Sequence, residues 1–193
     1  AFVGVLSSAL TFTLLAMAMK HTSAAEATII VSFETVIAAI AGRATWRTRL
    51  ALIDHVTSPT GIVLPVARIV RELAAHGRGI DVLIDGAHAP GMLPLDLDGI
   101  GAAYYAGNCH KWLFAPKGAA FLWARRDMQA GLVPGVVSHG HGGGFAASFD
   151  WVGTRDPSPL LAAPEGIAFM RDLGVEAVQR WNHDLAWQAA QLL

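Results

Sequence analysis

Two side chains of opposite charge stand close behind apolar runs that are typical of buried strands. Asp85 follows Val82-Leu83-Ile84, and Lys111 lies in a turn just after the apolar run 102–106. Open α/β sheets bind ligands at the carboxyl ends of their strands, so we expect both side chains to converge on one crevice. An aspartate can hold a protonated ring nitrogen, and a lysine amine can condense with an aldehyde. The pair therefore predicts a site for pyridoxal phosphate, a flat cofactor that carries both groups.

The neighbours of Lys111 favour a reactive amine over an ordinary surface lysine. Trp112-Leu113-Phe114 follows it directly, and apolar surroundings favour imine formation. The alternative is a surface lysine whose aliphatic stem covers a tryptophan. Lys117 is the competing lysine, and its place just before the next apolar run indicates a charge at the end of a loop.

Asp85 also has a plain structural interpretation. An aspartate before a glycine is typical of a turn in which the carboxylate accepts a hydrogen bond from its own backbone. Taken alone, Asp85 favours this turn role, and it gains a cofactor role only together with Lys111.

Short continuous apolar runs joined by helical segments predict an α/β fold with a mostly parallel sheet and flanking helices. The last pair of strands leaves room for an antiparallel member. The expected strands are 50–53, 82–84, 102–106 and 118–123. The expected helices are 33–41, 65–75, 159–173 and 175–193, with Gly77 and Gly174 as stops and a glycine-rich loop at 140–144.

Composition narrows the class of protein. The 193 residues are 53% hydrophobic and 15% charged, and the net charge of −1 argues against a nucleic-acid partner. The single cysteine, Cys109, excludes an internal disulfide framework and favours a reducing compartment, so we expect a cytoplasmic protein.

The first residues have two interpretations. Residues 2–19 carry no charge and approach the length of a membrane span. Their length and polar members favour a buried helix and strand by about two to one, so a membrane role is not expected. The sequence begins on Ala1 rather than on a methionine, which favours a fragment or a processed product.

Three motifs together resemble the class V aminotransferase-fold enzymes, most of all the isopenicillin N epimerase-like group. They are Asp85-Gly86-Ala87-His88-Ala89-Pro90-Gly91, Gly107-Asn108-Cys109-His110-Lys111-Trp112 and Pro116-Lys117-Gly118. The resemblance implies a partial large domain of a fold-type I pyridoxal phosphate-dependent transferase over 29–173. It leaves 1–28 unassigned and makes 174–193 a helix that leads toward a small domain outside the chain.

The resemblance also assigns roles around the cofactor ring. Lys111 matches the lysine that forms the Schiff base, and Asp85 matches the partner of the ring nitrogen. His88 falls where a glutamine or histidine contacts the phenolic oxygen of the ring. Ser58, in Thr57-Ser58-Pro59-Thr60-Gly61, matches a polar residue near the same oxygen.

On the phosphate side, the resemblance implies contacts from Asn108 and His110. Thr154 matches a threonine that reaches the phosphate bound by the neighbouring subunit, and Arg155 is placed to share that duty. A homodimer with its site at the subunit interface is therefore implied. The family's phosphate loop, and the arginine that binds the substrate carboxylate, would lie outside the chain.

The activity implied is chemistry at the α-carbon of a small amino acid, with epimerisation favoured by the resemblance. Transamination and β-elimination, as in a C–S lyase, share the same first step and stay open. Cys109 favours a packing role over the persulfide chemistry of cysteine desulfurases. A catalytically silent truncated chain is a further hypothesis, and a metal-dependent hydrolase built on His139 and His141 is a weaker one, so we expect no metal.

Overall fold

The computed structural model describes residues 48–77, 79–151 and 153–192. The predictions for 1–28 and for a helix at 33–41 lie outside these residues. In chain order the elements are β1 (Leu50–Asp54), α3 (Val66–Ala75), β2 (Asp81–Gly86), α4 (Leu97–Ile100), β3 (Tyr104–Asn108), β4 (Ala120–Ala124), the 3₁₀ helix η1 (Arg126–Gly131), α5 (Phe145–Asp150), α6 (Ser158–Leu161), α7 (Ala163–Leu173) and α8 (Val175–Ala190).

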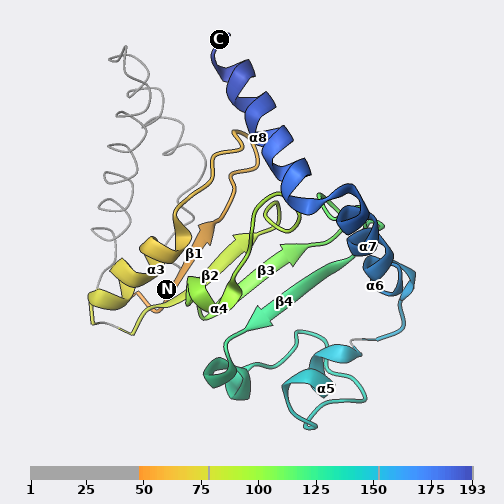
Figure 1. Ribbon diagram of the computed structural model, residues 1–193. Coiled ribbons are helices and arrows are strands. Elements are labelled where there is room, and N and C mark those ends of the chain that lie inside the picture. Colours follow the sequence, from red (N-terminus) through yellow and green to blue (C-terminus); the bar gives the residue numbers. More distant parts are fainter. Residues whose placement is uncertain (1–47, 78, 152, 193) are drawn as a thin grey trace. The chain divides into compact units, whose positions relative to one another are not determined.

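The predicted α/β class with a mostly parallel sheet is confirmed. The strands are hydrogen-bonded in the order β1-β2-β3-β4. β1 and β2 are parallel, and β4 runs opposite to β3, as their arrows show in Figure 1. The chain divides into two compact units, of which the first holds 48–88 and 96–106 and the second holds 89–95 and 107–192 of the described part.

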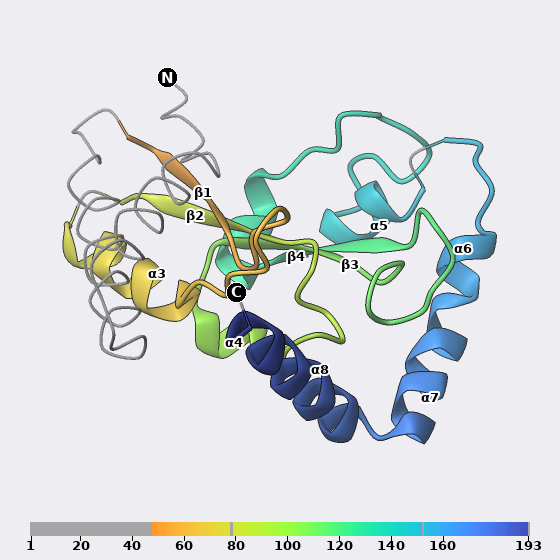
Figure 2. The same cartoon turned by 90° about the horizontal axis from the view of Figure 1, so that it is seen from above.

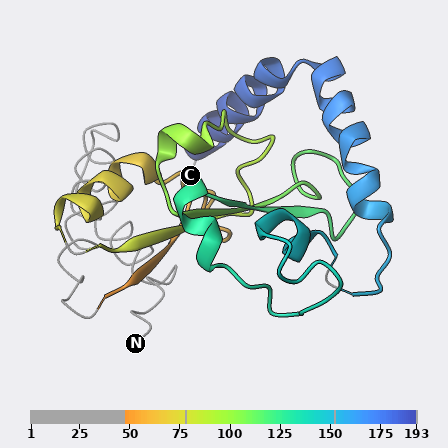
Figure 3. The ribbon, with the colours of Figure 1, turned by 90° about the horizontal axis from the view of Figure 1, so that it is seen from below.

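The first unit is a parallel strand pair covered on one face. The register of β1 with β2 runs from Leu50 opposite Asp81 to Asp54 opposite Asp85. Ile84 is fully buried, whereas Leu52, on the opposite face of the pair, is 42% exposed. α3 buries Val66, Ile69, Val70 and Leu73, which share one face of a helix. Figures 2 and 3 show α3 and α4 on the same side of the two strands.

In the second unit, helices lie on both sides of β4. Figures 2 and 3 show α7 and α8 on one side and α5 on the other. Met170 of α7 is 2% exposed, whereas no described residue of α8 is buried. Within the described part of the chain, no helix combines the length and the apolar character needed to cross a lipid bilayer.

Several boundaries differ from the sequence predictions. The short helix α4 was not predicted, although Asp96 caps it by accepting a hydrogen bond from Gly99 N and Gly101 ends it at φ 73°. β3 and β4 each begin two residues later than expected. The helix expected at 159–173 is two helices, because Pro164 has no N–H to continue the ladder of α6. η1 and α5 were also missed.

Candidate active site

The first unit places two carboxylates side by side at the ends of β1 and β2. Asp54 and Asp85 are register partners, and the backbone N–H of His55 donates to the carbonyl oxygen of Asp85 at 2.8 Å. Partners in a parallel pair share one face, so both side chains leave the sheet on the same side. The predicted position of Asp85 at a strand end is therefore correct, and a second acid stands beside it.

Asp85 is held by its own turn. The backbone N–H of Ala87 donates to Asp85 Oδ1 at 3.0 Å, which is the turn role that the sequence also allowed. This hydrogen bond occupies one carboxylate oxygen and fixes the orientation of the group. Asp85 is exposed at the strand end. An exposed, oriented anion suits the protonated nitrogen of a cofactor ring, so the chemistry of Asp85 fits pyridoxal phosphate.

Asp54 was not singled out from the sequence. Partial burial raises the pKa of its carboxyl group, and the negative charge of Asp85 raises it further. The charge of His88 acts in the opposite direction, which places His88 within electrostatic reach of Asp54. The parallel register of β1 and β2 is the signal that would have identified this residue.

Ser58 lies on an exposed turn that Thr57 organises. The buried Thr57 hydroxyl accepts a hydrogen bond from Ile62 N at 3.0 Å and lies 2.5 Å from the hydroxyl of Thr60. Gly61 N also donates to the carbonyl oxygen of Thr57. The turn is thus fixed from within, which gives Ser58 a defined place after the end of β1.

The second unit holds Lys111 in a closed loop between β3 and β4. Both Cys109 N and His110 N donate to the carbonyl oxygen of Ala119 in front of β4, and Ala115 N donates back to Cys109 O. Lys111 itself is half-buried within this loop. The Cys109 thiol is free, and burial raises its pKa, in keeping with a packing role.

The ring of His110 has a defined tautomer. Its Nδ1 lies 2.8 Å from the carbonyl oxygen of Ala119, which can only accept, so Nδ1 carries a proton. In the neutral ring Nε2 is then an acceptor, and donation to a phosphate through Nε2 requires the charged ring. Asn108 is the last residue of β3 rather than part of the turn that follows.

The expected apolar enclosure of Lys111 was wrong for two of its three neighbours. Trp112 is 40% exposed and Phe114 is 52% exposed. Phe114 adopts φ 59°, a left-handed conformation that is costly for a bulky residue. Its ring packs edge-on against Phe169 of α7, with ring centroids 5.3 Å apart. The loop is therefore shaped by packing at its far end rather than by burial around the lysine.

Two glycines let other segments approach this loop closely. A side chain on Gly166 of α7 would overlap the carbonyl oxygen of Leu113. A side chain on Gly91 would come within 2.6 Å of the carbonyl oxygen of Trp112, and Gln179 of α8 donates to Gly91 O at 3.2 Å. Sequence reasoning missed Gly166 because nothing local distinguishes it from any other helical glycine.

The remaining candidates lie on exposed segments of the second unit. Thr154 and Arg155 are both exposed, ahead of the turn in which Asp156 accepts two hydrogen bonds from Ser158. His139 and His141 occupy a turn-rich loop before α5. Over the residues that the structure describes, no three His, Cys, Asp or Glu side chains gather in a group able to hold a metal ion.

Comparison with known proteins decides the family. The sequence pattern of Aminotransferase class-V matches residues 27–193. The chain belongs to this family. Its members depend on pyridoxal phosphate, as the Asp85 and Lys111 motifs predicted.

Relatives of this class V chain include L-cysteine desulfhydrases and isopenicillin N epimerases. A probable chloroplastic L-cysteine desulfhydrase of Arabidopsis thaliana is 39% identical over 76% of the chain and 32% of its own length. Isopenicillin N epimerase of Streptomyces clavuligerus is 41% identical over 76% of the chain and 40% of its own length. The chain thus spans well under half the length of these curated relatives.

A solved structure agrees with the fold. The cystine C–S lyase C-DES, in complex with its product cysteine persulfide, is 28% identical with a TM-score of 0.65. The match covers 74% of this chain and 41% of that one, so the described fold corresponds to part of a larger domain. The epimerase preference drawn from the sequence is not singled out by these matches.

Replacing Gly166 tests the close approach of α7 to the Lys111 loop. Gly→Ala inside a helix ordinarily stabilises by about 0.5–1 kcal/mol. Here Gly166→Ala should destabilise by about 1–3 kcal/mol, because the new methyl group overlaps the loop backbone. Urea unfolding measures the change. Gly131→Ala is the control, since a side chain there meets no atom within 4 Å. Stabilisation by Gly166→Ala would contradict the packing.

Replacing Asp54 tests the carboxylate pair through pH. The pKa of Asp54 is raised above its ordinary value of 3.8 in the folded state, so ionisation of this group costs folding stability. The protonated carboxyl group makes its full contribution to folding stability below pH 3.8, and this contribution is lost as pH rises through the pKa of the folded state. Asp54→Asn should therefore gain stability over the unmodified protein between about pH 4 and pH 7. Urea unfolding across this range measures the gain, and equal stability of Asp54→Asn and the unmodified protein throughout would contradict the carboxylate pair.

Proposed function

We propose that this chain is part of a pyridoxal phosphate-dependent enzyme that removes a proton from the α-carbon of a small amino acid. The match to the class V family over 27–193 supports the cofactor. The observation that carries the proposal is the oriented carboxylate of Asp85 at the end of β2, with Ala87 N holding one oxygen. When bound, pyridoxal phosphate draws electron density away from the substrate α-carbon.

The proposed roles follow from the chemistry of each side chain. Asp85 accepts a hydrogen bond from the ring nitrogen and keeps it protonated. Lys111 supplies the amine that anchors the cofactor and, once displaced by the substrate amine, the base that accepts the α-proton. His88 serves the ring's phenolic side together with Ser58, whose turn is fixed by Thr57.

On the phosphate side we propose Asn108 and His110. The Nδ1 proton of His110 is already donated to Ala119 O, so only a proton on Nε2 is left to face a phosphate.

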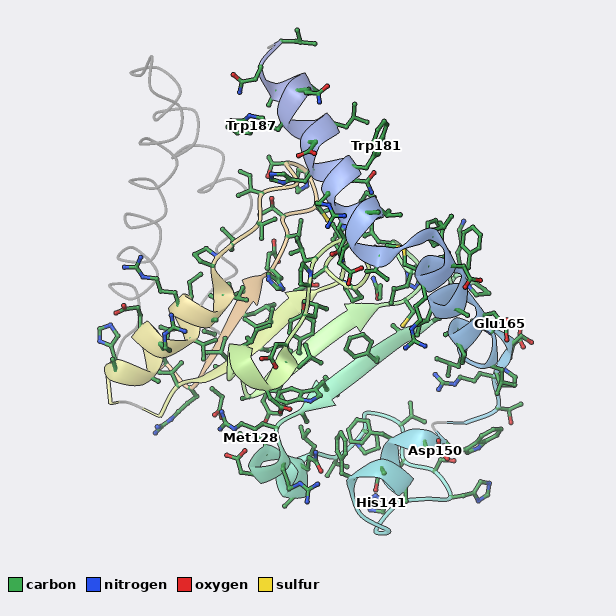
Figure 4. All side chains as sticks on the ribbon, in the orientation of Figure 1. Met128, His141, Asp150, Glu165, Trp181 and Trp187 are labelled. Atoms are coloured by element: carbon green, nitrogen blue, oxygen red, sulfur yellow. The ribbon has the colours of Figure 1, made fainter. Side chains whose placement is uncertain are left out.

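A homodimer is proposed with Thr154, and Arg155 beside it, reaching the phosphate held by the neighbouring subunit. The exposure of both residues supports this role. Large apolar side chains on α8 also face solvent: Trp181 is 71% exposed and Trp187 is 42% exposed, and both project from the helix in Figure 4. Such surface is typical of protein contacts. A cytoplasmic location stays a prediction.

We propose two candidate reactions that both begin with removal of the α-proton. Return of the proton to the opposite face inverts the α-carbon, in line with the identity to isopenicillin N epimerase. Loss of sulfide from the β-carbon of cysteine is supported equally by the desulfhydrase relative and by the C–S lyase structure. Transamination remains a third outcome, and a catalytically silent chain is the opposing hypothesis.

The lysine assignment is tested by reductive trapping. Purified protein mixed with pyridoxal phosphate should develop the visible absorbance of an imine, and borohydride should fix the cofactor on Lys111, located by peptide mass spectrometry. Lys111→Ala should lose the absorbance and the adduct completely, because the amine is gone. Lys117→Ala, the exposed lysine of the same loop region, should retain both. An adduct that persists in Lys111→Ala would refute the assignment.

The two outcomes are separated by their products. Incubation with L-cysteine should release sulfide if β-elimination dominates, measured by a colorimetric sulfide assay. In D₂O, an epimerase should instead introduce α-deuterium into both stereoisomers of its amino acid with no sulfide, as seen by NMR. Asp85→Asn should lower either rate by about 10²-fold or more, since the ring nitrogen loses its anionic partner. If cofactor-loaded protein gives no sulfide, no α-deuterium and no keto acid, the silent-chain hypothesis is favoured.

A further inference from the structure

A buried histidine–tyrosine pair in the first unit has no part in the roles described so far. His55 Nδ1 lies 2.8 Å from the hydroxyl oxygen of Tyr105, and the two rings meet edge-on with centroids 5.9 Å apart. His55 is 8% exposed and Tyr105 is 1% exposed. Burial lowers the pKa of His55 and raises that of Tyr105, so the pair is neutral near pH 7.

Both residues of the pair contact the Asp85–Gly86 segment at the end of β2. On one side, the backbone N–H of His55 donates to Asp85 O at 2.8 Å. On the other, the Tyr105 ring occupies the space that a side chain on Gly86 would need. The hydrogen bond therefore joins the residue that follows β1 to β3, next to Gly86 at the end of β2. The charge of Asp85 also raises the pKa of Tyr105, which places the phenol within electrostatic reach of that carboxylate.

We propose that His55 and Tyr105 are positioning residues for Asp85, whose carboxylate their buried hydrogen bond holds at the angle needed by the cofactor ring nitrogen. This inference rests on the proposed role of Asp85. A displacement of about 1 Å at a catalytic group lowers rates by about 10²-fold, so a rigid support beneath Asp85 has a direct effect on the reaction.

The alternative is that the pair only stabilises the fold. If the role is only structural, a variant that lacks the pair should have a lower melting temperature without cofactor, and the protonation of the bound ring nitrogen should not change. If the pair positions Asp85, the protonation of the ring nitrogen should change in variants that remain folded. The protonation of the ring nitrogen, read from the ¹⁵N NMR shift of labelled pyridoxal phosphate, separates the two and does not depend on turnover.

Three single variants make the test specific. Tyr105→Phe removes the hydroxyl but keeps the ring over Gly86, and His55→Leu removes the partner nitrogen. His55→Asn retains a hydrogen-bonding atom near the position of Nδ1 and is the conservative rescue.

We expect Tyr105→Phe and His55→Leu to shift the ring nitrogen signal toward the unprotonated position and to lower kcat by about 10-fold, with KM changed by less than about 2-fold. His55→Asn should match the unmodified protein. The double variant His55→Leu/Tyr105→Phe should be no worse than either single variant, because one shared bond is lost.

The inference is overturned if folded Tyr105→Phe, or folded His55→Leu, retains the signal and kcat of the unmodified protein while borohydride still fixes the cofactor on Lys111. If the unmodified protein itself shows no adduct on Lys111 or an unprotonated ring nitrogen, the proposed function fails together with this inference. Should Tyr105→Phe not fold, His55→Leu against His55→Asn carries the same comparison.

Discussion

The parallel pairing of β1 with β2 is the constraint on which the first group of site residues depends. Its register sets Asp54 opposite Asp85, and its continuation beyond the strands lets His55 N bind Asp85 O. A slip of one residue would turn Asp85 to the opposite face of the sheet. The buried face, with Ile84 at its centre, makes such a slip costly, because it would expose the apolar core. Hydrophobic packing therefore fixes the place of a charged group.

The Lys111 loop is shaped by backbone hydrogen bonds at its base and by packing against α7 at its far end. Ala119 O accepts hydrogen bonds from two successive backbone N–H groups and from the ring of His110. Gly166 brings α7 against the loop, and Phe114 is kept in a left-handed conformation beside Phe169. Such strain persists only where the surroundings impose it, and it is often associated with functional sites.

The sequence predicted the features that depend on residues close together in the chain. The apolar run before Asp85 and the motif around Lys111 identified the strands, the fold class and the family. The sequence did not predict contacts between residues that are far apart in the chain. Asp54 gains importance only from its register with Asp85, and His55 meets Tyr105 fifty positions away. Trp112 and Phe114 were expected to enclose Lys111, but an apolar side chain beside a loop residue can equally face solvent, as both do here.

Both proposed outcomes rest on one amine and one carboxylate at the same cofactor, so the central claim is that Lys111 and Asp85 serve one ring. A crystal structure of the borohydride-reduced protein tests this most directly. We predict continuous density from Lys111 Nζ to the cofactor, with an Asp85 carboxylate oxygen within hydrogen-bonding distance of the ring nitrogen. A cofactor joined to another lysine, or a ring nitrogen that faces a group other than Asp85, would contradict the account.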